Sequence, residues 1–227
     1  MAEVTVAAPS ADLLEELAAL DAQFETAPAG KVVAWAMERF GSSLVVAASF
    51  QDVVLIDLAV AHDPGVEVVF LDTEAHFPET LAFVDEIRDR YDLHLTVTHP
   101  GPEAAGTPCG SEGCCAVRKV APLRGALEGR LAWLTALKRV DATTRTVAPI
   151  VSWDAGFGLV KVNPLATWTE DDIASYLVDH DLPAHPLVAQ GYLSIGCAPT
   201  TRPVAQGEDP RSGRWSGTDK VECGLHA

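Results

Sequence analysis

Short apolar runs that alternate with helical patterns are the feature that most constrains this chain. Residues 42–49, 66–73 and 93–99 each have the composition of a strand, and the first two are apolar almost throughout. Such runs are typical of strands buried in a parallel sheet. Helical spacing follows at 53–62 and again from Pro78. Strands that alternate with helices predict an α/β fold: a doubly wound, mainly parallel sheet with helices on both faces.

Further elements extend this pattern in both directions. Helical spacing over residues 10–40 predicts two helices, separated by Pro28 and Gly30 and ended by Gly41. Downstream we expect a helix that opens at Cys114-Cys115 and runs to about 128, a strand at 131–137, a hairpin over 151–162, and a helix at 173–180 preceded by a capping box of Thr169 and Asp172. Beyond residue 190 the chain becomes rich in Gly and Pro, and regular patterns fade.

The charge distribution favours a small anionic ligand. The net charge of -16 excludes general binding to DNA or RNA, and no apolar run reaches the roughly 18 residues that span a membrane. The 16 Lys and Arg are nevertheless clustered, mostly within 118–145 and 202–220. Ordinary surface ion pairs are the alternative interpretation of these clusters.

The cysteines indicate metal or redox chemistry in a reducing compartment. There are five, an odd number, and the N-terminus is acidic rather than basic, so we expect a cytoplasmic protein without a secretory signal. Cys114 and Cys115 are adjacent and are followed by Arg118 and Lys119, whose charges would offset thiolates at a metal centre. A pair of reduced, half-buried thiols on a helix is the alternative.

Two loops lie where parallel sheets bind ligands. Residues 50–52 (FQD) join a strand to a helix, and backbone N–H groups at such a helix start suit an anion. Asp72 and Thr73 end the next strand. The chain has no Walker A pattern and no GxGxxG, so these loops alone name no ligand.

With these motifs in place, the chain resembles the adenylyl-sulfate/phosphoadenylyl-sulfate reductases of assimilatory sulfate reduction. The matching segments, in family order, are 49–51 (SFQ), 71–73 (LDT), 76–80 (HFPET), 114–123 (CCAVRKVAPL), 194–197 (SIGC), 207–215 (GEDPRSGRW) and 222–226 (ECGLH). The last three segments are specific to the family, whereas the first two are shared with other adenine nucleotide α-hydrolases. The resemblance implies three regions: N-terminal helices at 1–40, a nucleotide-binding α/β domain at 41–190, and a segment at 191–227 that carries the nucleophile.

The resemblance also implies a reaction. The Cys223 thiolate would attack the sulfur of adenosine 5′-phosphosulfate and expel AMP, and thioredoxin would then reduce the S-sulfocysteine to release sulfite. The implied nucleotide and anion ligands are Ser49, Phe50, Gln51, Leu71, Lys119, Arg145, Arg211 and Arg214. His76 and His226 also lie in family motifs. The electron donor and the oligomeric state, a homo-oligomer included, are not fixed by the sequence.

The family's branch that uses adenylyl sulfate holds a [4Fe–4S] cluster on a Cys-Cys pair and a later Cys-x-x-Cys. Here Cys114, Cys115 and Cys197 match, but Thr200 stands at the fourth position. Three explanations remain open: Cys109 completes the set, three cysteines hold a labile or [3Fe–4S] cluster, or the cluster is lost. Glu74 in place of a glycine, and residues 136–139 (ALKR) in place of Gly-x-Arg-Arg, are further departures.

Two other functions remain open at this stage. A cluster-free enzyme that reduces the 3′-phosphorylated substrate would explain Thr200. A non-catalytic nucleotide sensor with structural zinc on Cys109, Cys114, Cys115 and Cys197 is the other, although the spacing lacks paired Cys-x-x-Cys knuckles.

Overall fold

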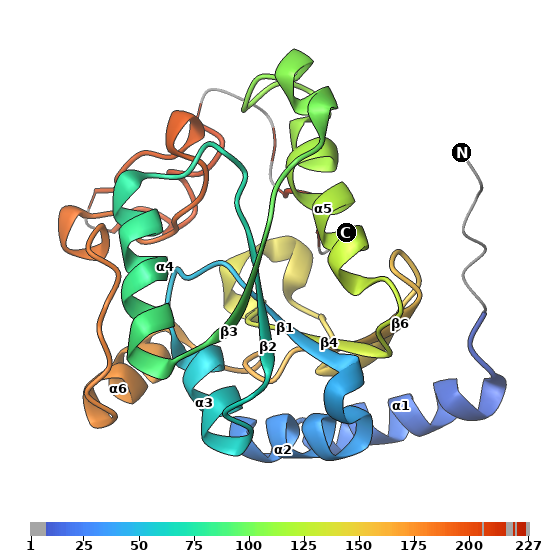
Figure 1. Ribbon diagram of the computed structural model, residues 1–227. Helices are drawn as coiled ribbons and strands as arrows, with labels where there is room; N and C mark the ends of the chain where they lie inside the picture. Colours follow the sequence, from blue (N-terminus) through green and yellow to red (C-terminus); the bar gives the residue numbers. More distant parts are fainter. Residues whose placement is uncertain (1–7, 206, 217–219, 221, 226–227) are drawn as a thin grey trace.

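A central sheet organises the computed structural model, which describes residues 8–205, 207–216, 220 and 222–225 (Figure 1). Within these residues the sheet has six strands in the order β3-β2-β1-β4-β6-β5. The strands are β1 (Leu44–Ala48), β2 (Glu67–Leu71), β3 (His94–Thr98), β4 (Ala132–Thr135), β5 (Val151–Asp154) and β6 (Leu159–Val162). Neighbours are parallel except for the β5–β6 hairpin. The predicted α/β class and mainly parallel sheet are confirmed.

Helices cover both faces of this sheet. They are α1 (Ala11–Phe24), α2 (Ala29–Phe40), α3 (Val54–His62), α4 (Pro78–Tyr91), α5 (Ala121–Leu127) and α6 (Glu170–Asp179). Figure 1 shows α5 on the opposite side of the sheet from α4. Among the described residues, no helix has the length and apolar character needed to cross a membrane.

The alternation of β1 explains the two-sided core. Val46 faces a large cluster that also contains Val33 of α2 and Ile56 of α3, whereas Val45 faces a smaller cluster with Leu123 of α5. Both strand residues are fully buried, which is why the sequence of β1 is apolar on both faces. Leu17 of α1 lies in the larger cluster, so the N-terminal helices share the core of the sheet.

Local signals in the sequence fix several element ends. The predicted capping box is present: the Thr169 side chain accepts from the N–H of Asp172, whose carboxylate accepts from the N–H of Thr169. Gly41 ends α2 with a φ of 51°. The predicted helix at 114–128 contains a π-helical turn, Ala116–Val120, ahead of α5. Such π-bulges often occur at functional sites.

The order of the strands positions the site. From β1 the chain continues to β2 and β3 on one side, and it returns on the other side of β1 as β4. A crevice forms outside the carboxyl ends of the strands at such a switch point. The loops that follow β1, β2 and β4 meet there, and the C-terminal segment joins them.

Candidate active site

A cavity of about 170 Å³ opens at the carboxyl edge of β1, β2 and β4. All but one of the residues predicted to bind nucleotide or anion line this cavity: Ser49, Gln51, Leu71, Lys119, Arg145, Arg211 and Arg214. Cys223, the predicted nucleophile, lines it as well. Residues about 170 positions apart in the sequence therefore face one space. His76 also lines the cavity, and its Nε2 lies 3.0 Å from the carbonyl oxygen of Leu71.

Phe50 is the exception, because its side chain points into the core. The ring is 1% exposed and packs edge-on against Phe70, with ring centroids 5.4 Å apart. Its φ of 56° lies in the left-handed region, which non-glycine residues rarely adopt. This buried ring anchors the turn between β1 and α3, and the flanking Ser49 and Gln51 are left at the cavity wall.

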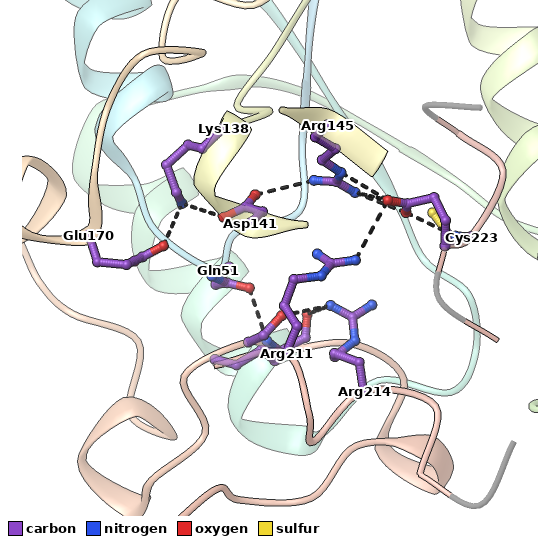
Figure 2. A network of polar contacts seen from close by, with 11 residues as sticks. Gln51, Lys138, Asp141, Arg145, Glu170, Arg211, Arg214 and Cys223 are labelled. Atoms are coloured by element: carbon purple, nitrogen blue, oxygen red, sulfur yellow. Dashed lines mark hydrogen bonds and ion pairs between the residues drawn. The ribbon is translucent and has the colours of Figure 1, made fainter. Parts of the chain in front are cut away.

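Gln51 joins this turn to the C-terminal segment. Its side-chain oxygen accepts a hydrogen bond of 2.9 Å from the backbone N–H of Ile195 (Figure 2). Arg214 binds the same segment, since its guanidinium donates to the Ser194 hydroxyl and to the Ile195 carbonyl at 3.2 and 3.1 Å. The motif at 194–197 is thus held against the loop after β1.

Three arginines give the cavity a positive wall. Burial lowers the pKa of Arg211 and of Arg214, and a neighbouring cation lowers each further: Arg145 acts on Arg211, and Arg211 acts on Arg214. Guanidinium groups stay charged under these conditions. A crowded cationic wall of this kind is stabilised by an anion, as the clustering of basic residues in the sequence indicates.

In this structure the anion is the carboxylate of Glu222. Arg145 donates to both of its oxygens at 2.9 Å, and an Arg211 nitrogen lies 3.7 Å away (Figure 2). Burial raises the pKa of Glu222, but the Cys223 N–H and the two arginines outweigh burial and lower the pKa overall. The ion pair places the neighbouring Cys223, a half-buried free thiol, beside the arginines. His226, the last residue of the matching motif, lies outside the described residues.

A second polar network, which includes Lys138 and Asp141, lines the same cavity and was not predicted from the sequence. Lys138 is 2% exposed, and its ammonium lies 3.4 Å from carboxylate oxygens of both Asp141 and Glu170. Asp52 is half-buried nearby, and desolvation raises its pKa against the attraction of Lys138. Asp141 also accepts from Arg145 at 3.2 Å, so this network supports the cationic wall.

The thiols predicted as metal ligands lie near Lys119, whose charge acts on Cys109 and Cys197. The sulfurs of Cys114 and Cys115 are 3.9 Å apart, and that of Cys197 lies 3.5 Å from the Thr73 hydroxyl at the end of β2. Cys109 forms a hydrogen bond with Cys197, which lowers the pKa of Cys197 and raises that of Cys109. The charge of Lys119 adds to the lowering of the Cys197 pKa, whereas it opposes only in part the raising of the Cys109 pKa. No three Cys, His, Asp or Glu side chains within the described ranges are arranged around a single metal ion.

Comparisons with known proteins point to one family. A family model described as the phosphoadenosine phosphosulfate reductase domain matches residues 43–203. An adenosine 5′-phosphosulfate reductase of Mycobacteroides abscessus is 46% identical over 217 residues, with 91% of each chain covered. A protein of the same name from Mycobacterium tuberculosis is 46% identical over 241 residues, covering 94% of this chain and 95% of the relative.

Solved structures reproduce the fold. A phosphoadenylyl-sulfate reductase from Candida auris superposes with a TM-score of 0.71 at 23% identity, covering 86% of this chain and 99% of the other. An FMN adenylyltransferase from Candida glabrata gives a TM-score of 0.62 at 15% identity, covering 91% and 72%. At these identities the structures support the fold alone.

Proposed function

The chain belongs to the phosphoadenosine phosphosulfate reductase family, and we propose from this premise that it reduces adenosine 5′-phosphosulfate to sulfite and AMP. It is an oxidoreductase that acts on a sulfur group. One observation supports this substrate at the cavity: Cys223 lines the same cavity as Lys119, Arg145, Arg211 and Arg214. A nucleophile and a cationic wall that face one space are what attack on a phosphosulfate requires.

The residues divide the reaction between them. The Cys223 thiolate attacks the sulfur, a sulfur–sulfur bond forms, and the sulfur–oxygen bond to phosphate breaks. AMP leaves with the electron pair of the broken bond, and Arg145 and Arg211 stabilise the charge that develops on its phosphate. Ser49, Gln51 and Leu71, at the ends of β1 and β2, hold the adenosine in the switch-point crevice.

A dithiol protein completes the cycle, and we propose thioredoxin. One of its thiolates attacks the Cys223 sulfur and displaces sulfite, and its second thiol resolves the mixed disulfide and restores Cys223. The substrate sulfur gains two electrons in this sequence, and the dithiol loses two. All five cysteines are free thiols, which suits a reducing compartment such as the cytoplasm.

We further propose that the thiols beside Lys119 hold a [4Fe–4S] cluster. The donor set fits, because thiolates are the preferred ligands of such clusters. Cys114, Cys115 and Cys197 are buried, and Cys109 interacts with both Cys114 and Cys197. When bound, the cluster would supply a charged, polarisable centre near the substrate site. The relatives named adenosine 5′-phosphosulfate reductases, at 43–46% identity, support this substrate over the 3′-phosphorylated one.

Labelling of the nucleophile tests the proposed reaction. Anaerobically purified protein is incubated with ³⁵S-labelled adenosine 5′-phosphosulfate without reductant, and peptides are then mapped by mass spectrometry. We expect one SO₃ adduct on Cys223 and none in a Cys223→Ser variant. The 3′-phosphorylated nucleotide serves as the competing substrate. An adduct on another cysteine, or none, would refute the proposed reaction, and preferential labelling by the 3′-phosphorylated nucleotide would reverse the substrate assignment.

A further inference from the structure

The loop that carries Cys109 packs directly on Thr200, the residue that departs from the family's fourth cysteine position. A Cβ built on Gly110 would lie 2.8 Å from the Thr200 side-chain methyl. The backbone of Gly110, next to Cys109, therefore packs directly against the Thr200 side chain, and only a glycine at position 110 allows this close approach. Gly110 also has a φ of 93°, which disfavours any other residue.

Thr200 itself presents no ligand to the thiols. Its hydroxyl is 3.4 Å from the carbonyl oxygen of Cys197, to which it donates, while its methyl group faces Gly110. A hydroxyl is also a poor ligand for the iron of an iron–sulfur cluster, because this iron is bound preferentially by soft thiolates. The fourth ligand must therefore come from another residue if the cluster has four protein ligands.

Cys109 is placed among the other three thiols. It shares a hydrogen bond with Cys197 and lies close enough to Cys114 to interact with its charge. The next N–H along the chain, that of Gly110, donates to the Cys114 sulfur at 3.3 Å. Cys115 is 3.9 Å from Cys114, sulfur to sulfur. The four thiols thus form one continuous group, and a four-iron cluster, larger than a single ion, does not need them to converge on one point.

The loop is held in this position by Arg118. Its guanidinium donates to the carbonyl oxygens of Thr73, Ala104 and Thr107 at 2.8, 2.9 and 3.3 Å. Glu74 lies 3.4 Å from the same guanidinium. Glu74 and Thr200 are both departures from the family pattern. Glu74 contacts Arg118, and Thr200 contacts the Cys109 loop at Gly110.

Resting on the proposed function, we propose that Cys109 is the fourth thiolate ligand of the [4Fe–4S] cluster, together with Cys114, Cys115 and Cys197. The ligand has moved from the Cys-x-x-Cys position to the neighbouring loop, and Thr200 is the packing surface for that loop. This assignment excludes both a three-cysteine cluster and loss of the cluster.

Iron and sulfide analysis with visible and electron paramagnetic resonance spectra tests this assignment. Wild type, Cys109→Ser, Thr200→Cys and the double variant are purified anaerobically. We expect a full [4Fe–4S] complement in wild type, loss of at least half of the iron or a [3Fe–4S] signal in Cys109→Ser, and recovery in the double variant. Glu112→Gln, an exposed residue of the same loop, is the matched control and keeps the wild-type spectrum.

Alkylation provides a second measurement that does not depend on how well the variants fold. In the holoprotein Cys109 is expected to resist iodoacetamide, and it becomes reactive after the iron is removed with a chelator. Full iron retention in Cys109→Ser, or unprotected Cys109 in a protein with a full cluster, would overturn the assignment.

The wild-type protein separates this assignment from the proposed reaction. Wild type without iron that still acquires an SO₃ group on Cys223 would refute the ligand assignment and leave the reaction standing. A full cluster that is lost in Cys109→Ser, together with no labelling of Cys223 in the wild type, would support the ligand assignment and refute the proposed reaction.

Discussion

His185 is a buried base whose neutral form the fold requires. It is 1% exposed and packs against the Phe83 ring, with centroids 5.1 Å apart. Its Nδ1 accepts from the Leu187 N–H at 3.2 Å, so its Nε2 carries the proton and donates to the Thr80 hydroxyl at 3.0 Å. Burial lowers the pKa of His185 to about 4, and the carboxylate of Glu79 opposes this only in part.

This lowered pKa predicts a loss of stability on acidification. Between the ordinary pKa of 6.5 and the folded value of about 4 the unfolded chain binds more protons, so the free energy of unfolding falls as pH falls through that window. The loss is at most about 3 kcal/mol. Urea unfolding at neutral pH and near pH 4.5 measures it. We expect His185→Gln to have a shallower pH dependence than wild type, whereas His62→Gln, at an exposed position, does not; equal slopes in all three would contradict the prediction.

At the same scale, the sequence predicted the residue types of the site better than their placement. The cations and Cys223 were identified by motif position, and they line one cavity. Phe50 was grouped with them, but its side chain is buried against Phe70. Neither that contact nor the burial of Lys138 between Asp141 and Glu170 leaves a local periodicity, because each depends on residues brought together only by the fold.

At the scale of elements, prediction worked where a pattern is local. Strand and helix positions followed from apolar periodicity, and the capping box of α6 followed from Thr169 and Asp172. The π-helical turn Ala116–Val120 was not predicted, since its residues have ordinary helical spacing. Cys114 and Cys115 immediately precede this turn, and Arg118 and Lys119 lie within it.

A two-segment bridge in the C-terminal part positions Arg214. Thr201 pairs with Arg214 in an isolated antiparallel bridge, and the Arg202 N–H donates to the Gly213 carbonyl at 3.0 Å. A side chain at Gly213 would lie well inside contact distance of the Arg202 carbonyl oxygen. Because that obstacle is backbone, the bridge must open to accommodate it.

We therefore expect Gly213→Ala to displace Arg214 and weaken binding of the nucleotide. The predicted effect is a rise of about tenfold in the dissociation constant of AMP, or about 1.4 kcal/mol, with a lower melting temperature. Calorimetric titration and thermal unfolding measure the two. Gly125→Ala is the control: nothing lies within 4 Å of its Cβ inside α5, so we expect slight stabilisation. Unchanged AMP binding in Gly213→Ala would argue against the bridge as the element that positions Arg214.

At the scale of the whole molecule, the C-terminal segment forms one wall of the cavity at the carboxyl edge of the sheet. Leu225 packs against the smaller apolar cluster that contains α5, while Glu222 pairs with Arg145, which follows β4, and with Arg211, which lies earlier in the same segment. The tail is thus attached by an apolar contact at one end and an ion pair at the other. Glu222 occupies the charge position that the phosphosulfate would take.

Competition between the Glu222 carboxylate and the nucleotide for the arginines predicts that the Glu222→Gln variant binds nucleotide more tightly. It also predicts that the C-terminal tail of this variant is less firmly attached. At neutral pH Glu222 is ionised, since its pKa is lowered, so removal of the charge leaves Arg145 and Arg211 without their carboxylate. We expect the dissociation constant of AMP to fall about fivefold, or about 1 kcal/mol. Without nucleotide, iodoacetamide should modify Cys223 faster than in wild type. Glu208→Gln, which removes an exposed carboxylate paired with Arg202, is the matched control. Weaker AMP binding in Glu222→Gln would mean that Glu222 organises the arginines for the substrate instead of competing with it, and the tail would then be a fixed wall of the site.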